Sequence, residues 1–125
     1  MGRFIIRRKK HQRSGIRSED GPIRCGAHLK WVRGLQCAVP DCDTGDRIEA
    51  AHVRSGTDGG TGQKPGDNWV VPLCATHHRE QHQDGEATFW RRHIGIHDPR
   101  IMARDVWVLS PAGKRYRKEQ EEAEQ

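Results

Sequence analysis

Two short apolar runs, separated by a polar and glycine-rich stretch, predict the centre of the fold. Residues 47–53 (RIEAAHV) and 69–74 (WVVPLC) are rich in apolar and β-branched side chains, as strands usually are. Pro72 marks the second run as an edge strand or a strand end. Residues 54–68, between the two runs, contain five glycines and one proline and predict a long loop.

A helical pattern follows the second strand. A helix is predicted over about 75–83 and closed by Gly85, and another over 86–94 (EATFWRRHI). Residues 98–109 begin with aspartate and proline, which supply an N-cap and a favoured first helical residue, and predict a third helix. The centre of the chain therefore reads as strand, long loop, strand and helix, with helical flanks.

The segment before the first strand carries a helix and a turn. Apolar residues in GAHLKWVRGL (26–35) recur at helical spacing and indicate a short helix. Residues 36–42 (QCAVPDC) predict a strand that runs into a tight turn, because proline and aspartate favour turning. Residues 1–22 have few apolar side chains and are interpreted as an arm, in which residues 4–6 predict a short strand.

Composition limits the class of protein. The chain has 125 residues, of which 33% are hydrophobic and 31% charged, so we expect one small domain with a modest core. Four cysteines and eight histidines favour a bound metal as a staple. No apolar run can span a membrane, and the N-terminal apolar stretch is too short for a secretory signal. We therefore expect a cytoplasmic protein whose cysteines are ligands or free thiols.

Charge indicates an acidic partner. The net charge is +5 and the pI is about 9.3, which favours nucleic acid. We divide the chain into a basic arm (1–22), a domain (23–112) and a charged tail (113–125) that is interpreted as solvated. The arm allows either DNA contacts or a solvated tail. The predicted DNA-contacting side chains lie in the arm and in the long loop: Arg7, Arg8, Lys9, Lys10, Arg54 and Lys64.

Adjacent histidines on the helix after the second strand point in different directions. An α-helix turns about 100° per residue. Cys74 and His77 are three residues apart and share one face, whereas His78 and His82 are four apart and share another. One helix can therefore serve two sites.

The first of these sites is a Cys₃His set. Cys37 and Cys42 flank a turn, and Cys74 and His77 stand at the start of a helix, a pattern that suits tetrahedral zinc. Cys25 lies outside both pairs and could replace His77 as the fourth ligand. The spacing favours His77, which leaves Cys25 as a free, buried thiol.

The second site is a histidine pair. His78 and His82, at i and i+4 on a helix, are placed to hold a divalent metal, although such pairs are also common on surfaces. His52 ends a strand that we expect to pack beside this helix. A lone strand histidine is usually structural, but a position facing a metal site favours function.

The order of these motifs resembles a known superfamily. EAAHVR, a glycine-rich loop and DNWVVPLCATHHREQH are similar to the HNH, or ββα-metal, nucleases, and in particular to a phage-associated branch with recombination-linked members. The likeness covers roughly residues 27–85. It implies an α+β fold with a small ββα-metal core, a structural zinc site and flanking helices. It also implies that His52 is the general base and that His78, with His82, binds the catalytic metal.

Two positions depart from the family pattern. Ala51 stands where many members carry a metal ligand, so the third ligand is open between Asp67, Glu49, Asp46 and water. The middle asparagine of the motif has no exact counterpart in spacing. Asn68 and Asp67 are therefore both kept as catalytic-site candidates.

The resulting hypothesis is a DNA endonuclease that hydrolyses phosphodiester bonds with a divalent metal, Mg²⁺ or Mn²⁺, with Ni²⁺ and Zn²⁺ as further candidates. The alternatives are a non-catalytic zinc module that binds DNA or a recombination partner, and an assembly factor of phage packaging. A zinc module has no need of His52.

Overall fold

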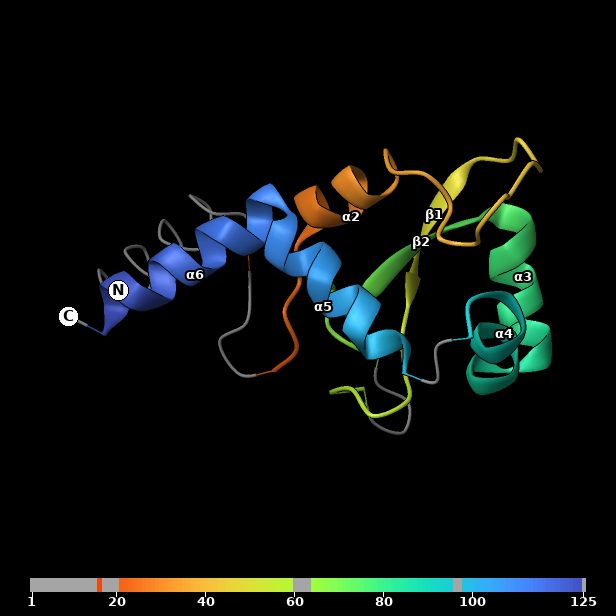
Figure 1. The fold of residues 1–125 in the computed structure, drawn as a ribbon. Coiled ribbons are helices and arrows are strands. Elements are labelled where there is room, and N and C mark those ends of the chain that lie inside the picture. Colours follow the sequence, from red (N-terminus) through yellow and green to blue (C-terminus); the bar gives the residue numbers. More distant parts are fainter. Residues whose placement is uncertain (1–15, 17–20, 60–63, 96–97, 125) are drawn as a thin grey trace.

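The described part of the chain is a small α+β fold with a two-stranded sheet and five helices (Figure 1). The computed structural model describes residues 16, 21–59, 64–95 and 98–124. The α+β class is as predicted, whereas the predicted strand at residues 4–6 lies outside the described residues. The elements are α2 (Gly26–Val32), β1 (Ile48–His52), β2 (Val70–Cys74), α3 (Ala75–Asp84), α4 (Glu86–His93), α5 (Pro99–Leu109) and α6 (Pro111–Ala123).

The two strands form an antiparallel pair in which Pro72 lies opposite Ala50. The Val53 N–H donates to the Trp69 carbonyl at 2.8 Å, and hydrogen-bonded pairs alternate along an antiparallel ladder. Pro72 therefore occupies a non-hydrogen-bonded position, where its missing N–H removes no ladder bond. Its carbonyl accepts the Ala38 N–H at 2.8 Å on the outer edge. The prediction of an edge strand at Pro72 is confirmed for the described sheet.

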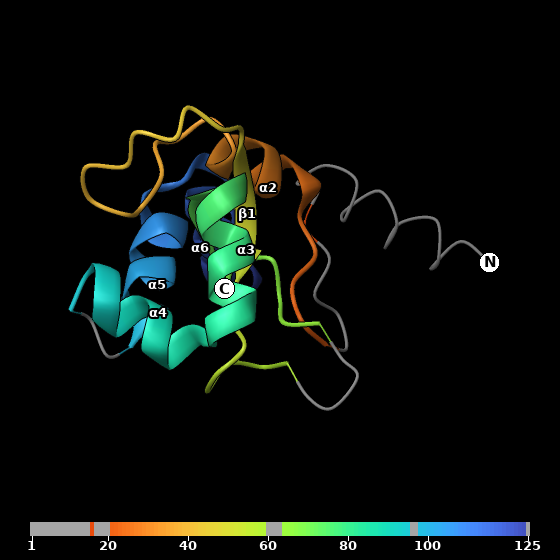
Figure 2. The same cartoon turned by 90° about the vertical axis from the view of Figure 1, so that its right-hand side faces the viewer.

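Helix α3 lies on one side of this hairpin, and helices α2 and α5 lie on the other (Figures 1 and 2). Helix α3 begins directly after β2, with Cys74 as its N-cap, and ends at Gly85, whose φ of 86° is a left-handed conformation that favours glycine. Helix α4 starts at the next residue and packs back against α3. Strand β2 and helices α3 and α4 thus form one short, continuous segment.

Proline and a capping side chain start each of the last two helices. The Asp98 carboxylate accepts the Arg100 N–H at 3.0 Å and Pro99 opens α5, as predicted. The Ser110 hydroxyl accepts the Gly113 N–H at 2.9 Å and opens α6. Helix α6 covers most of the segment that the sequence suggested was a solvated tail. Ala112 and Gly113 in its first turn are buried, and most of the residues after them are exposed. This helix extends away from the sheet, with the C-terminus at its far end (Figure 1).

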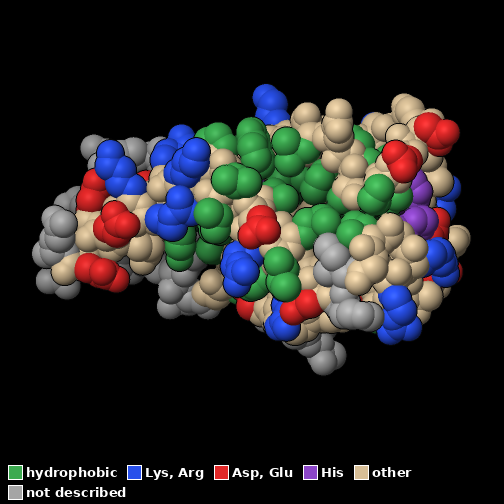
Figure 3. Space-filling model, in the orientation of Figure 1, with side chains coloured by type: hydrophobic (Ala, Val, Ile, Leu, Met, Phe, Trp, Pro, Cys, Tyr) green, Lys and Arg blue, Asp and Glu red, His purple; other side chains and the backbone are tan. Residues whose placement is uncertain are grey.

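Two clusters of buried residues form the core. The larger one joins both strands to α4 and α5, through residues such as Leu73, Phe89, Trp90 and Ala103. The smaller one joins the segment before α2 to α5 and α6, and includes Trp107. Three large apolar side chains on α5 stay exposed, and a broad apolar area crosses the centre of Figure 3. The three exposed side chains on α5 are Ile101, Val108 and Leu109.

The segment before β1 differs from its prediction. Residues 36–42 form a bend and a turn rather than a strand, with Asp41 at a φ of 59°. The single backbone bond from Ala38 to β2 is too little for a third strand, and Val39 turns into the core instead. The turn itself is as predicted, and it presents two cysteines to the start of α3. No helix in the described residues is both long and apolar enough to cross a membrane.

Candidate metal centre and histidine clusters

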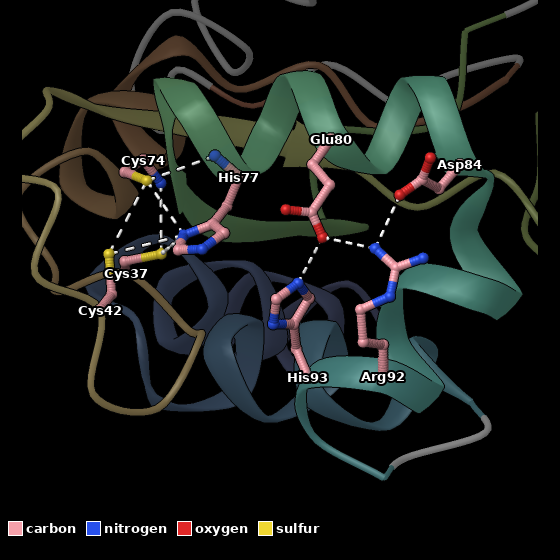
Figure 4. Close-up of polar contacts among 8 residues, drawn as sticks. All are labelled: Cys37, Cys42, Cys74, His77, Glu80, Asp84, Arg92 and His93. Carbon is pink, nitrogen blue, oxygen red and sulfur yellow. Dashed lines mark hydrogen bonds and ion pairs between the residues drawn. The ribbon is translucent and has the colours of Figure 1, made fainter.

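Three cysteines and one histidine converge where β2 passes into α3 (Figure 4). Cys37 and Cys42 come from the turn before β1, Cys74 ends β2, and His77 lies in the first turn of α3. The Nδ1 atom of His77 lies 3.2 Å from the sulfur of Cys74, 3.5 Å from that of Cys42 and 3.6 Å from that of Cys37. The predicted Cys₃His cluster is therefore confirmed.

The spacing of these four atoms fits a tetrahedral ion. Zinc bonded to sulfur and imidazole at usual lengths separates two sulfurs by about 3.8 Å, and a sulfur from a nitrogen by about 3.6 Å. The sulfurs of Cys42 and Cys74 are 3.8 Å apart, and those of Cys42 and Cys37 lie 3.5 and 3.6 Å from Nδ1 of His77, close to the second value. The cluster could thus hold a metal such as zinc.

The surroundings of the sulfurs also suit a bound cation. Burial raises the pKa of the Cys37 thiol to about 11, so a positive charge is needed to keep its thiolate near neutral pH. The backbone N–H groups of Cys74 and His77 donate to the sulfurs of Cys37 and Cys74 at 3.3 and 3.4 Å. Cys25 is buried in the smaller core cluster, apart from this set. The geometry favours His77 over Cys25 as the fourth ligand.

A second group of possible ligand atoms lies on the other side of the His77 ring (Figure 4). Glu80 accepts hydrogen bonds from His93 and, at 2.8 Å, from Arg92, which also contacts Asp84 at 2.7 Å. The bond from His93 holds the pKa of Glu80 below its usual range. An imidazole that binds a metal through Nδ1 keeps its proton on Nε2 and has no lone pair for a second ion. We therefore interpret this group as a clamp between α3 and α4.

His52 pairs with a buried carboxylate. Its Nε2 atom lies 3.0 Å from Oδ1 of Asp67, whose side chain is only 6% exposed. The other carboxylate oxygen accepts the Cys25 N–H at 2.8 Å, while Arg24 approaches Oδ1 at 3.8 Å. Burial opposes ionisation of Asp67, but these contacts outweigh it and hold the pKa of Asp67 below its usual range. An ionised carboxylate can only accept, so Nε2 of His52 carries the proton and Nδ1 has a free lone pair.

His78 and His82 form a separate cluster on the outer face of α3. Their Nε2 atoms face each other at 3.2 Å, while Nδ1 of His78 contacts Glu49 at 2.8 Å. The bond from His78 is the main cause that lowers the pKa of Glu49, and Arg47 supports it. Since ionised Glu49 accepts the Nδ1 proton, Nε2 of His78 has a lone pair directed toward His82. The 3.2 Å between the two Nε2 atoms is a hydrogen-bond distance, and it is also close to the roughly 3.3 Å that separates two imidazole ligands of one tetrahedral ion.

The structure distinguishes the three carboxylates considered as a third ligand. Asp46 accepts a hydrogen bond from Thr76, and Asp67 faces His52. Only Glu49 contacts the pair of His78 and His82, and it does so at the nitrogen that faces away from the second histidine. In this geometry Glu49 holds the His78 ring by its Nδ1 atom and leaves Nε2 facing His82.

The remaining predicted site residues lie outside these clusters or outside the described residues. Asn68 has a buried side-chain oxygen without a hydrogen-bond partner, and it contacts neither His52 nor His78 through a hydrogen bond. The backbone N–H of Arg54 donates to Glu86, and Lys64 is exposed. The basic side chains predicted in the arm lie outside the described residues: Arg7, Arg8, Lys9 and Lys10.

Several contributors were not predicted from the sequence. Arg24 lies beside Asp67 and also donates to the carbonyls of Lys64 and Pro65, which anchors the end of the long loop. No local pattern signals these contacts, because they join residues about 40 positions apart. Glu80 could have been found, since it lies three residues after His77 on the same helix face.

The fold and site together define a small α+β protein with a Cys₃His cluster and two further histidine clusters. The chain belongs to DUF968, a family described as proteins of unknown function, which it matches over residues 18–102. That match spans the Cys₃His cluster and both other histidine clusters. No curated protein and no solved structure gives a significant match.

Proposed function

We propose that this protein is a metal-dependent endonuclease that hydrolyses phosphodiester bonds in DNA. The contact between Nε2 of His52 and Asp67 carries the proposal. Nuclease chemistry needs a base that is oriented and kept in one tautomer, and a buried, ionised carboxylate does both. A purely structural zinc module has no use for such a pair outside its ligand set. The resemblance of the motif order to HNH nucleases supports the same reading.

His52 would act as the general base through its free Nδ1 atom. Asp67 accepts the Nε2 proton, fixes the direction of the ring and stabilises the imidazolium that forms when Nδ1 takes a proton from water. Arg24, at 3.8 Å, and the Cys25 N–H keep Asp67 ionised while this happens. Near neutral pH an imidazole is well suited to this proton transfer.

His78 and His82 would hold the catalytic divalent metal, and Glu49 would orient His78 for that purpose. When bound there, the metal would neutralise charge on the phosphate and on the leaving oxygen. Two imidazoles leave several coordination positions open. Water and phosphate would fill these positions, including the one for which Ala51 supplies no ligand. The Cys₃His cluster would hold a structural zinc that fixes the start of α3, and so the direction of both histidines.

Plasmid nicking tests the proposal. The zinc-loaded protein should convert supercoiled plasmid to the nicked form when Mg²⁺ or Mn²⁺ is added, and should do so far more slowly without the added metal. His82→Ala should lose this stimulation, with partial recovery at higher Mn²⁺, while Thr88→Ala, at an exposed position of neighbouring α4 away from the histidine pair, serves as a matched control. If the parent protein binds DNA but never nicks it with any divalent metal, the non-catalytic zinc module is the better account.

A further inference from the structure

A hollow of about 420 Å³ lies beside the pair of His78 and His82. It is lined by Arg47, which directly precedes β1, by Glu49 of β1, and by residues of α3 such as Arg79. Polar and charged side chains dominate the named lining, and the hollow is open to solvent. A site of this kind suits a charged, solvated ligand better than an apolar one.

The two arginines of the hollow are in different electrostatic states. Arg47 forms two contacts with Glu49, at 3.0 and 3.1 Å, so its charge is largely compensated. Arg79 is exposed and, among the residues that the structure describes, has no hydrogen bond or ion pair. The guanidinium of Arg79 is therefore the available cation of the hollow, and its planar donors match phosphate oxygens.

We infer that this hollow binds a backbone phosphate of the nucleic acid and that Arg79 is its main cationic contact. The inference rests on the proposed function, since it takes DNA as the ligand. Arg79 follows His78 directly in α3, and both side chains line the same hollow. A phosphate held by Arg79 would thus lie next to the phosphate that is cleaved. Arg47 and Glu49 stay engaged with each other and with His78, so they form the wall of the site.

DNA binding as a function of salt tests this assignment without any cleavage step. The full-length, zinc-loaded protein is titrated against a short labelled DNA duplex without added divalent metal, over roughly 50 to 200 mM salt. Arg79→Ala should weaken binding about tenfold at low salt. It should also reduce the slope of log K against log salt by about 0.9, the loss of one phosphate contact, for duplexes of any sequence. Arg79→Lys should recover part of the affinity.

Arg91→Ala is the matched control, because Arg91 is an exposed arginine on neighbouring α4 that does not line the hollow. It should leave both affinity and slope near the parent values. Unchanged binding by Arg79→Ala, or equal losses for both variants, would overturn the inference. Inorganic phosphate is tested as a competitor. If Arg79→Ala abolished phosphate binding but left duplex affinity intact, the hollow would be a site for free anions and the inference would fail.

The result is independent of the nuclease assay. A protein that never cuts DNA can still show the loss at Arg79, and then only the catalytic proposal fails. A protein that cuts DNA can show no effect at Arg79, and then only the phosphate contact is wrong. Circular dichroism and zinc content of each variant establish that folding is intact, as expected for an exposed side chain.

Discussion

His77 and His78 are neighbours in α3, yet they belong to different clusters. Nδ1 of His77 lies 3.2 Å from the sulfur of Cys74, whereas Nδ1 of His78 lies 2.8 Å from the carboxylate of Glu49. The turn of about 100° between consecutive helical residues produces this division. One helix therefore joins a closed cluster, suited to a structural metal, to an open pair beside a surface hollow.

The closed cluster predicts about one tightly bound zinc per chain. Cys37→Ser should release the metal and lower the melting temperature, because metal binding contributes directly to folding. Cys25→Ser is the control, since Cys25 is buried outside the cluster, and this variant should keep its zinc. Elemental analysis and thermal melts measure both effects. A folded parent protein without zinc, or loss of zinc from the Cys25 variant alone, would contradict the assignment.

Substitution of His77 and substitution of His78 should damage different properties of the protein. His77→Ala should lose zinc and thermal stability, because it removes a ligand of the closed cluster. His78→Ala should keep both but lose metal-stimulated nicking, because only the open pair is damaged. Zinc content, melting temperature and plasmid nicking are measured on both variants. Equal loss of the same property in both would show that the two histidines serve one site.

A buried histidine predicts how stability depends on pH. His28 is fully buried between Trp31 and Trp107, and neither ring nitrogen has a hydrogen-bond partner. Burial lowers its pKa to about 4 from 6.5, despite the nearby charge of Asp67. The unfolded chain therefore binds this proton more readily than the folded one. Stability from this group is fully present above pH 6.5 and is lost as pH falls from 6.5 toward 4.

The size of this effect is roughly 2 kcal/mol between pH 7 and pH 5. His28→Phe keeps the ring contacts with both tryptophans but cannot be protonated, so its urea midpoint should change less over this range than that of the parent. Comparison with the parent cancels the effect of acid on zinc binding, which both proteins share. Equal pH dependence in the two proteins would show that His28 does not titrate as described.

The basic arm predicts a contribution to DNA binding that carries no sequence information. Seven basic residues precede Ser18 in the sequence. Deletion of residues 1–15, which removes six of these and keeps buried Ile16, should weaken binding at low salt and flatten the salt dependence, while the divalent-metal cleavage chemistry persists. Binding that is unchanged across a salt series would show that the arm is a solvated tail.

The sequence pattern correctly predicted those parts of the structure that depend on interactions between residues close together in the chain. The β-branched strands, the Asp98–Pro99 start of α5 and the i, i+3 spacing of Cys74 and His77 act within a few residues, and each is confirmed. Helix α6 carries the same kind of signal, since Ser110 caps it and Pro111 follows, whereas the acidic composition of residues 118–125 by itself favours a solvated tail.

The remaining features depend on contacts between distant segments. A strand was predicted over residues 36–42 from composition, but β2 offers that segment one backbone bond, from the Pro72 carbonyl. The contacts of Glu49 with His78 and of His52 with Asp67 join a strand to a helix and to a loop. Sequence spacing could propose these side chains, but only the folded chain shows which nitrogen each carboxylate contacts.

Cleavage by His52 variants tests the central claim most directly. The zinc-loaded parent, His52→Ala and Asp67→Asn are compared for plasmid nicking with Mn²⁺, and their zinc content and DNA affinity are measured in parallel. His52→Ala should lose cleavage by about 100- to 10,000-fold, the usual contribution of a general base, while zinc and affinity stay near the parent values. Asp67→Asn should be slower than the parent, because the amide no longer stabilises the imidazolium. If His52→Ala nicked DNA as fast as the parent, His52 would not be the base and the account would be contradicted.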